Sequence, residues 1–121
     1  MKFDDIDLID CFTSYESYYL DPNYDGVNIY EESRLYSRKY DDIELSMFIN
    51  IFEDRVNVKV KYKSICISEL FLEGVNEIIK VDNELKFIIW KDNNEYLKIC
   101  IGKINFDKFF LVDNLDDNNY L

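Results

Sequence analysis

The middle of the chain alternates between apolar and polar positions, which is the pattern of half-buried β-strands. In residues 43–51 isoleucine, leucine and methionine occupy one phase, and in residues 56–62 valines alternate with asparagine and lysines. The polar pair Glu53–Asp54 separates the two runs. We therefore expect a β-hairpin whose outer face carries lysines, which would keep that face wet and protect it as a sheet edge.

Five further apolar runs follow at short intervals and predict more strands. They cover residues 64–72, 75–81, 85–91, 96–101 and 104–112. Glycine, aspartate and asparagine separate most of them, and these residue types favour turns. Connections this short suit an antiparallel meander, because a βαβ crossover needs about a dozen residues. The earlier stretch 31–40 fits a helix or a strand equally well.

The first residues of the chain have a different pattern. Ile6, Ile9 and Phe12 recur on one side at helical spacing. The aspartates around them suit the positive end of a helix dipole. Pro22 cannot continue a helix, so the pattern predicts a helix over roughly residues 4–20.

Together these elements predict an α+β fold, with a predominantly antiparallel β-sheet of about five to seven strands and an N-terminal helix packed on it. The length of 121 residues fits a single domain over 1–121, because two separate cores of half that size would be marginal. A hydrophobic content of 48% excludes an intrinsically disordered chain. The polar stretch 114–121 is expected to be a flexible tail.

The composition also excludes several kinds of chemistry. The chain has no histidine, which removes histidine general bases, nucleophile pairs that depend on histidine and the usual zinc sites. The three cysteines form no C-x-x-C motif. Cys66 and Cys100 lie in apolar runs, so we expect both to be small buried side chains. We expect no enzyme, no cofactor and no metal site.

No apolar run approaches the length of a membrane span, about 18 residues. Residues 1–10 are acidic and do not resemble the basic start of a signal peptide. We therefore expect a cytoplasmic protein that does not enter a membrane. Its oligomeric state stays open at this point.

The charge is concentrated at the two ends of the chain. The net charge is −11, of which residues 1–32 carry −8 and residues 113–121 carry −3. This acidity argues against nucleic-acid binding, because phosphates are neutralised by lysine and arginine. Residues 1–32 also contain seven aromatic side chains, and acids among tyrosines are typical of a surface that docks on a basic protein.

The residues predicted to bind a partner are Tyr18, Tyr19, Asp21, Tyr24, Asp25, Tyr30, Glu31 and Glu32. Two alternatives remain open. The tyrosines could simply pack a helix onto the sheet while the acids aid solubility, or the interface could lie on the lysine-lined hairpin at 56–63.

Residues 21–32 also match the calcium-loop pattern D-x-[DN]-x-[DN]-G-x5-E. The pattern positions are filled by Asp21, Asn23, Asp25, Gly26 and Glu32. Pro22 and Asn28 are unfavourable in such a loop, and the chain has no second loop to pair with it. An ordinary turn explains the same residues, so a small calcium- or ligand-binding β domain is the alternative function.

The segment 62–74 carries an aromatic residue, then aliphatic residues, then the pattern Leu-x-Leu-x-Gly at its end. In this respect it resembles the strand pattern of small acidic bacterial immunity proteins of polymorphic and contact-dependent toxin systems. The resemblance implies a stoichiometric inhibitor of a toxin domain, often a basic nuclease. It transfers no binding residue to this chain.

Overall fold

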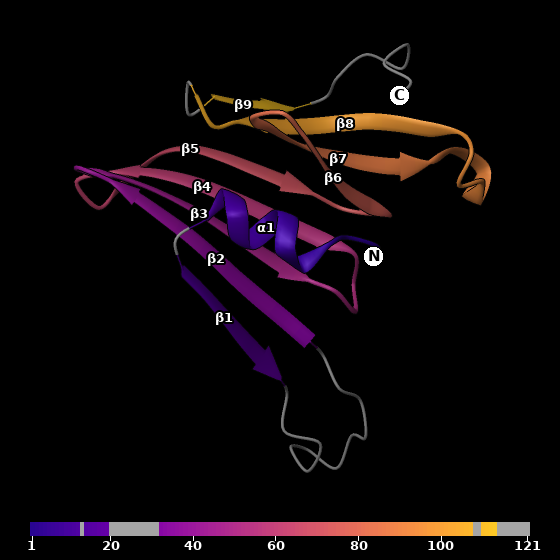
Figure 1. Cartoon of the computed structure of the whole chain (residues 1–121), viewed down its shortest axis with the longest axis horizontal. Helices are drawn as coiled ribbons and strands as arrows, with labels where there is room; N and C mark the ends of the chain where they lie inside the picture. Colours follow the sequence, from indigo (N-terminus) through magenta and orange to yellow (C-terminus); the bar gives the residue numbers. More distant parts are fainter. Residues whose placement is uncertain (13, 20–31, 108–109, 114–121) are drawn as a thin grey trace.

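The computed structural model of the chain describes residues 1–12, 14–19, 32–107 and 110–113, and the side chains of residues 1–12 and 33–107. In this part the chain forms one α-helix, one short 3-10 helix and nine β-strands. The strands make two antiparallel sheets, which confirms the expected α+β class with antiparallel sheet (Figure 1).

The first sheet has five strands in the order β1-β2-β3-β4-β5. Their bounds are β1 Ser14–Tyr19, β2 Glu32–Tyr40, β3 Ile43–Asn50, β4 Arg55–Tyr62 and β5 Ile65–Leu72. The second sheet follows in the order β6-β7-β8-β9, with bounds β6 Glu77–Val81, β7 Glu84–Trp90, β8 Lys98–Asn105 and β9 Phe110–Asp113. The helices are α1, Asp5–Cys11, and the 3-10 helix η2, Lys91–Asn93. Neighbouring strands are consecutive in sequence, so each sheet is a meander.

The turns between strands largely use aspartate in the left-handed region, as the polar breaks predicted. A φ of 53° to 54° is found at Asp41, Asp54, Asp82 and Asp92. The hairpin predicted from residues 43–51 and 56–62 is confirmed as β3 and β4. However, β4 is paired on both sides, with β3 and β5, so this hairpin is not a sheet edge.

There are more strands than the five to seven expected. Residues 14–19 form β1, and the ambiguous stretch 31–40 supplies β2. The apolar run 104–112 is divided between β8 and β9. Gly102 follows the apolar run 96–101 but does not end a strand, because it lies inside β8 opposite Phe87, next to a β-bulge.

The helix predicted over 4–20 ends at Cys11. The side chain of Asp4 caps its start by accepting a hydrogen bond from the backbone N–H of Ile6 over 2.8 Å. Residues 14–19 include three tyrosines, which favour strands, and they pair antiparallel with β2. Cross-strand pairing therefore replaces the second half of the predicted helix.

The apolar side expected for the helix is also wrong. Ile6 is 70% exposed and Ile9 is 50% exposed, whereas Leu8 and Cys11 are buried. Leu8 and Cys11 are three residues apart, so they also share one side of a helix, and this side continues into the buried Phe12. The helix α1 has only about two turns. The side that packs against the core is the side that continues into Phe12.

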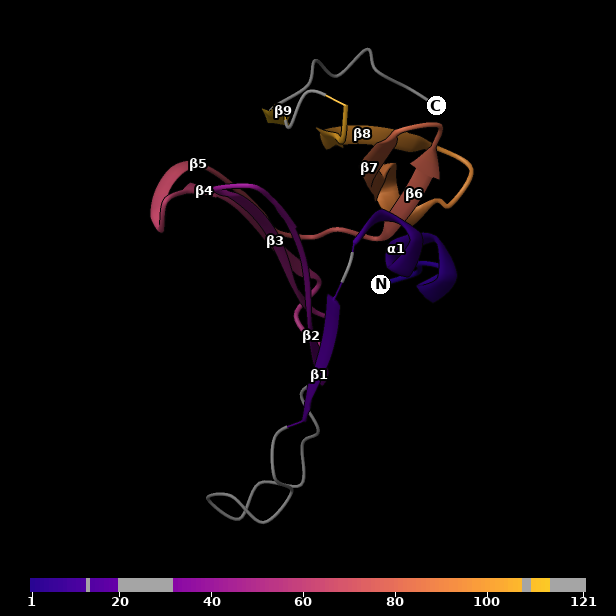
Figure 2. The ribbon, with the colours of Figure 1, turned by 60° about the vertical axis from the view of Figure 1, so that its left-hand side comes forward.

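The core lies between the two sheets and α1. The ring of Phe12 joins them, because its centroid lies 5.6 Å from that of Tyr36 on β2 and 5.5 Å from that of Phe106, which follows β8. Figure 2 shows α1 and β6–β9 on one side of the first sheet and no described helix or strand on the other. The first sheet bends, and its uncovered face lies on the inside of the curve.

Candidate functional site

The structure places three of the eight residues predicted to bind a partner. Tyr18 and Tyr19 lie on β1, an edge strand of the first sheet, and Glu32 begins β2. Tyr19 is the cross-strand partner of Glu32, and Tyr18 is that of Ser33. The backbone thus brings these three residues together. The other five, Asp21, Tyr24, Asp25, Tyr30 and Glu31, lie outside the described residues.

The possible calcium loop at 21–32 joins two strands, because β1 ends at Tyr19 and β2 begins at Glu32. An EF-hand loop is held between two helices, which give it its geometry. The segment therefore lacks the flanking elements of that motif. In the described part of the chain, no group of three or more Cys, Asp and Glu residues could hold a metal ion.

The three cysteines occupy different environments. Cys11 and Cys100 are buried, and burial raises the pKa of both thiols. Cys66 was expected to be buried, but it is exposed, as are all of the first five residues of β5. A raised pKa keeps Cys11 and Cys100 in the unreactive thiol form at neutral pH.

Glu77 on β6 is the one charged or polar residue among those described that is buried, at 6% exposure. Its carboxylate accepts a hydrogen bond from Trp90 Nε1 over 2.8 Å and pairs with Lys98 Nζ at 2.9 Å. Burial acts to raise the pKa of Glu77, but the hydrogen bonds from Lys98 and Trp90 and the charge of Lys98 outweigh it, and the pKa is lowered. With both partners engaged, Glu77 ties β6 to β7 and β8 as a structural group.

An acidic and apolar surface lies on α1. We call the side chains of Ile6, Asp7, Ile9 and Asp10 the acidic helix surface. Asp7 and Asp10 form no ion pair with any described residue, and Asp10 is exposed. The sequence reasoning missed this surface because it assigned Ile6 and Ile9 to the packed side of the helix.

Asp5 at the start of α1 and Cys11 at its end are fixed to β2. Asp5 forms an ion pair with Arg34, and the hydroxyl of Tyr36 donates to Asp5 Oδ1 over 3.4 Å. Arg38 Nη1 donates to the backbone carbonyl of Cys11, also over 3.4 Å. These contacts hold α1 in one orientation, in which Ile6, Ile9 and Asp10 remain exposed.

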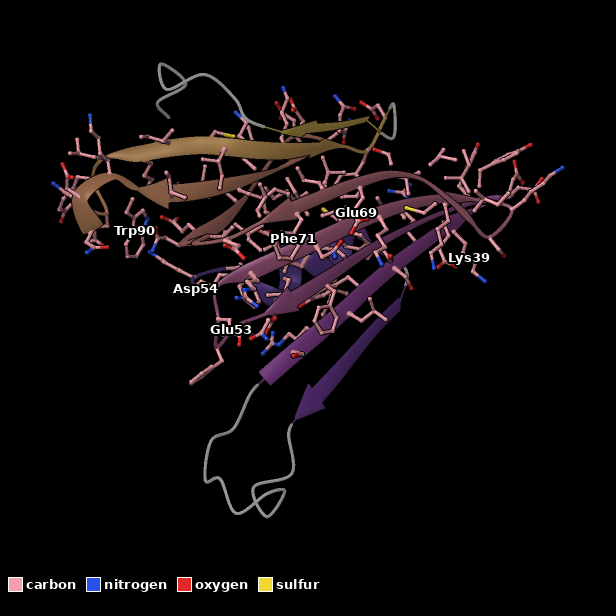
Figure 3. All side chains as sticks on the ribbon, turned by 180° about the vertical axis from the view of Figure 1, so that it is seen from behind. Lys39, Glu53, Asp54, Glu69, Phe71 and Trp90 are labelled. Carbon is pink, nitrogen blue, oxygen red and sulfur yellow. The ribbon has the colours of Figure 1, made fainter. Side chains whose placement is uncertain are left out.

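A second exposed surface is the uncovered face of the first sheet, which we call the open face. Its side chains come from alternating positions of β2 to β5 and enclose shallow depressions. They are Leu35, Ser37, Lys39, Glu44, Ser46, Phe48, Arg55, Asn57, Lys59, Lys61, Glu69 and Phe71. Figure 3 views this face from the side opposite α1, with Phe71 and Glu69 next to each other on β5.

The cross-strand register orders the open face into rows. One row runs Leu35–Phe48–Asn57–Phe71 across β2, β3, β4 and β5. The next row runs Ser37–Ser46–Lys59–Glu69. The sequence held a signal for the first row, because a phenylalanine in the polar phase of a strand must project from the wet face.

Comparison of the chain with protein-family models, with curated proteins and with solved structures gives no match. None of the helices in the described ranges is long and apolar enough to cross a membrane.

Proposed function

We propose that this chain is a non-catalytic cytoplasmic protein of the immunity type. It neutralises a cognate basic toxin domain, such as a nuclease, by stoichiometric binding. The observation that carries the proposal is the acidic helix surface. There the exposed Ile6 and Ile9 lie beside Asp7 and Asp10, which form no ion pair with any described residue.

This surface combines the two contributions that protein docking needs. Ile6 and Ile9 offer apolar area that is already in water and would be buried by a partner. Asp7 and Asp10 would attract a positive surface and speed the encounter. A nuclease suits such a surface because it must present a positive cleft to its own substrate.

Neighbouring features support a larger contact of the same kind. The helix is tied to β2, and β2 pairs with β1, on which Tyr18 and Tyr19 lie. Residues 1–32 carry −8 of the total charge. Tyr18 and Tyr19, from the partner-binding set predicted from the sequence, would add contact area at the edge of the first sheet.

Binding is also a better account than catalysis. The chain has no histidine, and the described pKa shifts move away from neutral pH. The pKa of the Glu77 carboxyl is lowered, and the pKa values of the Cys11 and Cys100 thiols are raised. A general acid or base works best with a pKa near the operating pH.

The proposal predicts that a gene next to this chain's gene encodes a toxin-like domain, and it is tested with that domain. Cells that express that domain should survive only when this chain is co-expressed, and calorimetry of the two purified proteins should give a 1:1 complex. Survival without a complex, or a complex that leaves the toxin active, would refute neutralisation by binding.

A further inference from the structure

We propose that the open face is a second docking site, for a segment of a protein that carries carboxylates beside apolar side chains. The open face lies on the other side of the first sheet from α1 (Figure 2). The inference does not rest on the function proposed above, because it uses different residues and the opposite charge.

The apolar part of the site is the row that contains Phe48 and Phe71. Phe48 is 40% exposed and Phe71 is 51% exposed. They belong to β3 and β5, with Asn57 of β4 between them. Leu35 of β2 continues the row, so three of its four strands contribute an apolar side chain on the inside of a curved sheet.

The cationic part of the site lies along β4. Lys59 and Lys61 project from the same face, about 6.6 Å apart along the strand. Neither forms an ion pair with any residue in the described ranges, although the chain has a net charge of −11. The neighbouring carboxylates are engaged elsewhere, because Glu44 pairs with Lys39 and Glu69 accepts a hydrogen bond from Asn57.

An unpaired acceptor lies at the centre of the apolar row. The Oδ1 atom of Asn57 is buried and has no hydrogen-bond partner among the described residues, while its Nδ2 donates to Glu69 Oε1 over 3.2 Å. A buried acceptor without a partner is unfavourable, so side-chain movements that expose Oδ1 to a donor from a bound chain would relieve that cost. A backbone N–H or a hydroxyl between apolar side chains would supply that donor.

These features favour a polypeptide over a nucleic acid. Exposed aromatic and lysine side chains on a sheet also suit single-stranded nucleic acids. However, Glu44 and Glu69 share the open face with the lysines, and the rest of the chain is strongly acidic, so a continuous phosphate backbone would be repelled. Separate carboxylates spaced to meet Lys59 and Lys61 avoid that repulsion.

The test is a titration of the ¹⁵N-labelled full chain, followed by amide chemical shifts, with the peptide Glu-Phe-Glu-Leu-Glu-Phe-Glu. The control peptide has lysine in place of each glutamate. We expect the acidic peptide to shift amides of β3, β4 and β5 with millimolar affinity, and the lysine peptide to bind at least fivefold more weakly. The double variant Lys59→Gln, Lys61→Gln should weaken binding of the acidic peptide at least threefold.

The matched control is the double variant Lys80→Gln, Lys86→Gln, which removes two half-buried strand lysines from the second sheet and should bind as the wild type does. Four results would overturn the proposal: no shift at several millimolar peptide, shifts confined to α1 or the second sheet, equal binding of both peptides, or equal binding by both double variants. A stronger shift of the same amides by oligothymidylate would assign the open face to nucleic acid instead.

Discussion

Asn57 Nδ2 donates a hydrogen bond to Glu69 Oε1 over 3.2 Å, although the residue directly opposite Glu69 on β4 is Lys59. The diagonal bond draws the carboxylate of Glu69 away from the lysine beside it. In the described part of the chain, Lys59 is thereby left without a counter-ion, and Asn57 Oδ1 is left without a hydrogen-bond donor. One cross-strand contact thus determines how charge is presented on the open face.

Replacing Asn57 by valine should stabilise the fold by about 0.5–1 kcal/mol, because it removes a buried unpaired acceptor and places a β-branched residue in a central strand. Urea denaturation measures the change. The matched control is Asn50→Val, which should destabilise, because Asn50 Oδ1 accepts the backbone N–H of Glu53 at 3.0 Å in the turn after β3. Loss of stability on Asn57→Val would show that the amide has a partner in solution.

Replacing Glu77 by glutamine should lower the free energy of unfolding at neutral pH by about 1–2 kcal/mol, because Lys98 loses its charged partner in a mostly buried site. The folded-state pKa of Glu77 is lowered, so its contribution is present above the unfolded pKa of about 4.3 and is lost as the pH falls through the folded value. The difference between wild type and variant should therefore shrink in acid.

Fluorescence of Trp90, the single tryptophan of the chain, follows this unfolding directly. Glu44→Gln serves as the control, since its pair with Lys39 at 3.6 Å is exposed and should contribute less than about 0.5 kcal/mol. A difference between wild type and Glu77→Gln that is constant from neutral to acid pH would contradict the assigned role.

The orientation of α1 gives a third prediction. Leu8→Ala should cost about 2–4 kcal/mol, because the side chain is fully buried. The double variant Ile6→Ser, Ile9→Ser should change stability by less than about 1 kcal/mol, because both side chains are already in water. Thermal or urea unfolding of the two variants decides the matter, and the reverse order of effects would mean that the helix packs through Ile6 and Ile9.

The sequence pattern was most informative where one physical signal dominated. Period-two alternation located β3 and β4, and aspartate or asparagine located the turns, because both depend on local geometry. The extent of α1 could not be found in this way. Residues 14–19 fit a helix by the spacing of their apolar side chains and a strand by their tyrosines. They form a strand because they pair with β2, which lies further along the sequence.

The candidate surfaces were only partly predictable for the same reason. Phe48 stands in the polar phase of its strand, so its exposure could be inferred from the sequence. The exposure of Ile6 and Ile9 could not, because either side of a two-turn helix can face a core. Glu69 bonds with Asn57 and not with Lys59 because of side-chain conformations, which cannot be inferred from the spacing of residues in the sequence.

The alternative of a calcium-binding domain gives a fourth prediction. We expect no calcium binding tighter than millimolar, because the segment 21–32 joins two strands and contains Pro22 and Asn28. Calorimetric titration of the purified chain with calcium chloride is the measurement. A micromolar site that disappears in Glu32→Ala would favour the calcium-binding alternative over the immunity proposal.

The most direct test of the account is the association rate with the cognate toxin domain, measured by stopped flow at low and at high salt. Wild type is compared with Asp7→Asn, Asp10→Asn and with a control of equal charge, Asp82→Asn, Asp92→Asn, placed in turns of the second sheet. The account predicts that the α1 variant associates severalfold more slowly at low salt, that added salt removes the difference, and that the control behaves nearly as wild type. Equal low-salt rates for wild type and the α1 variant would contradict docking through the acidic helix surface.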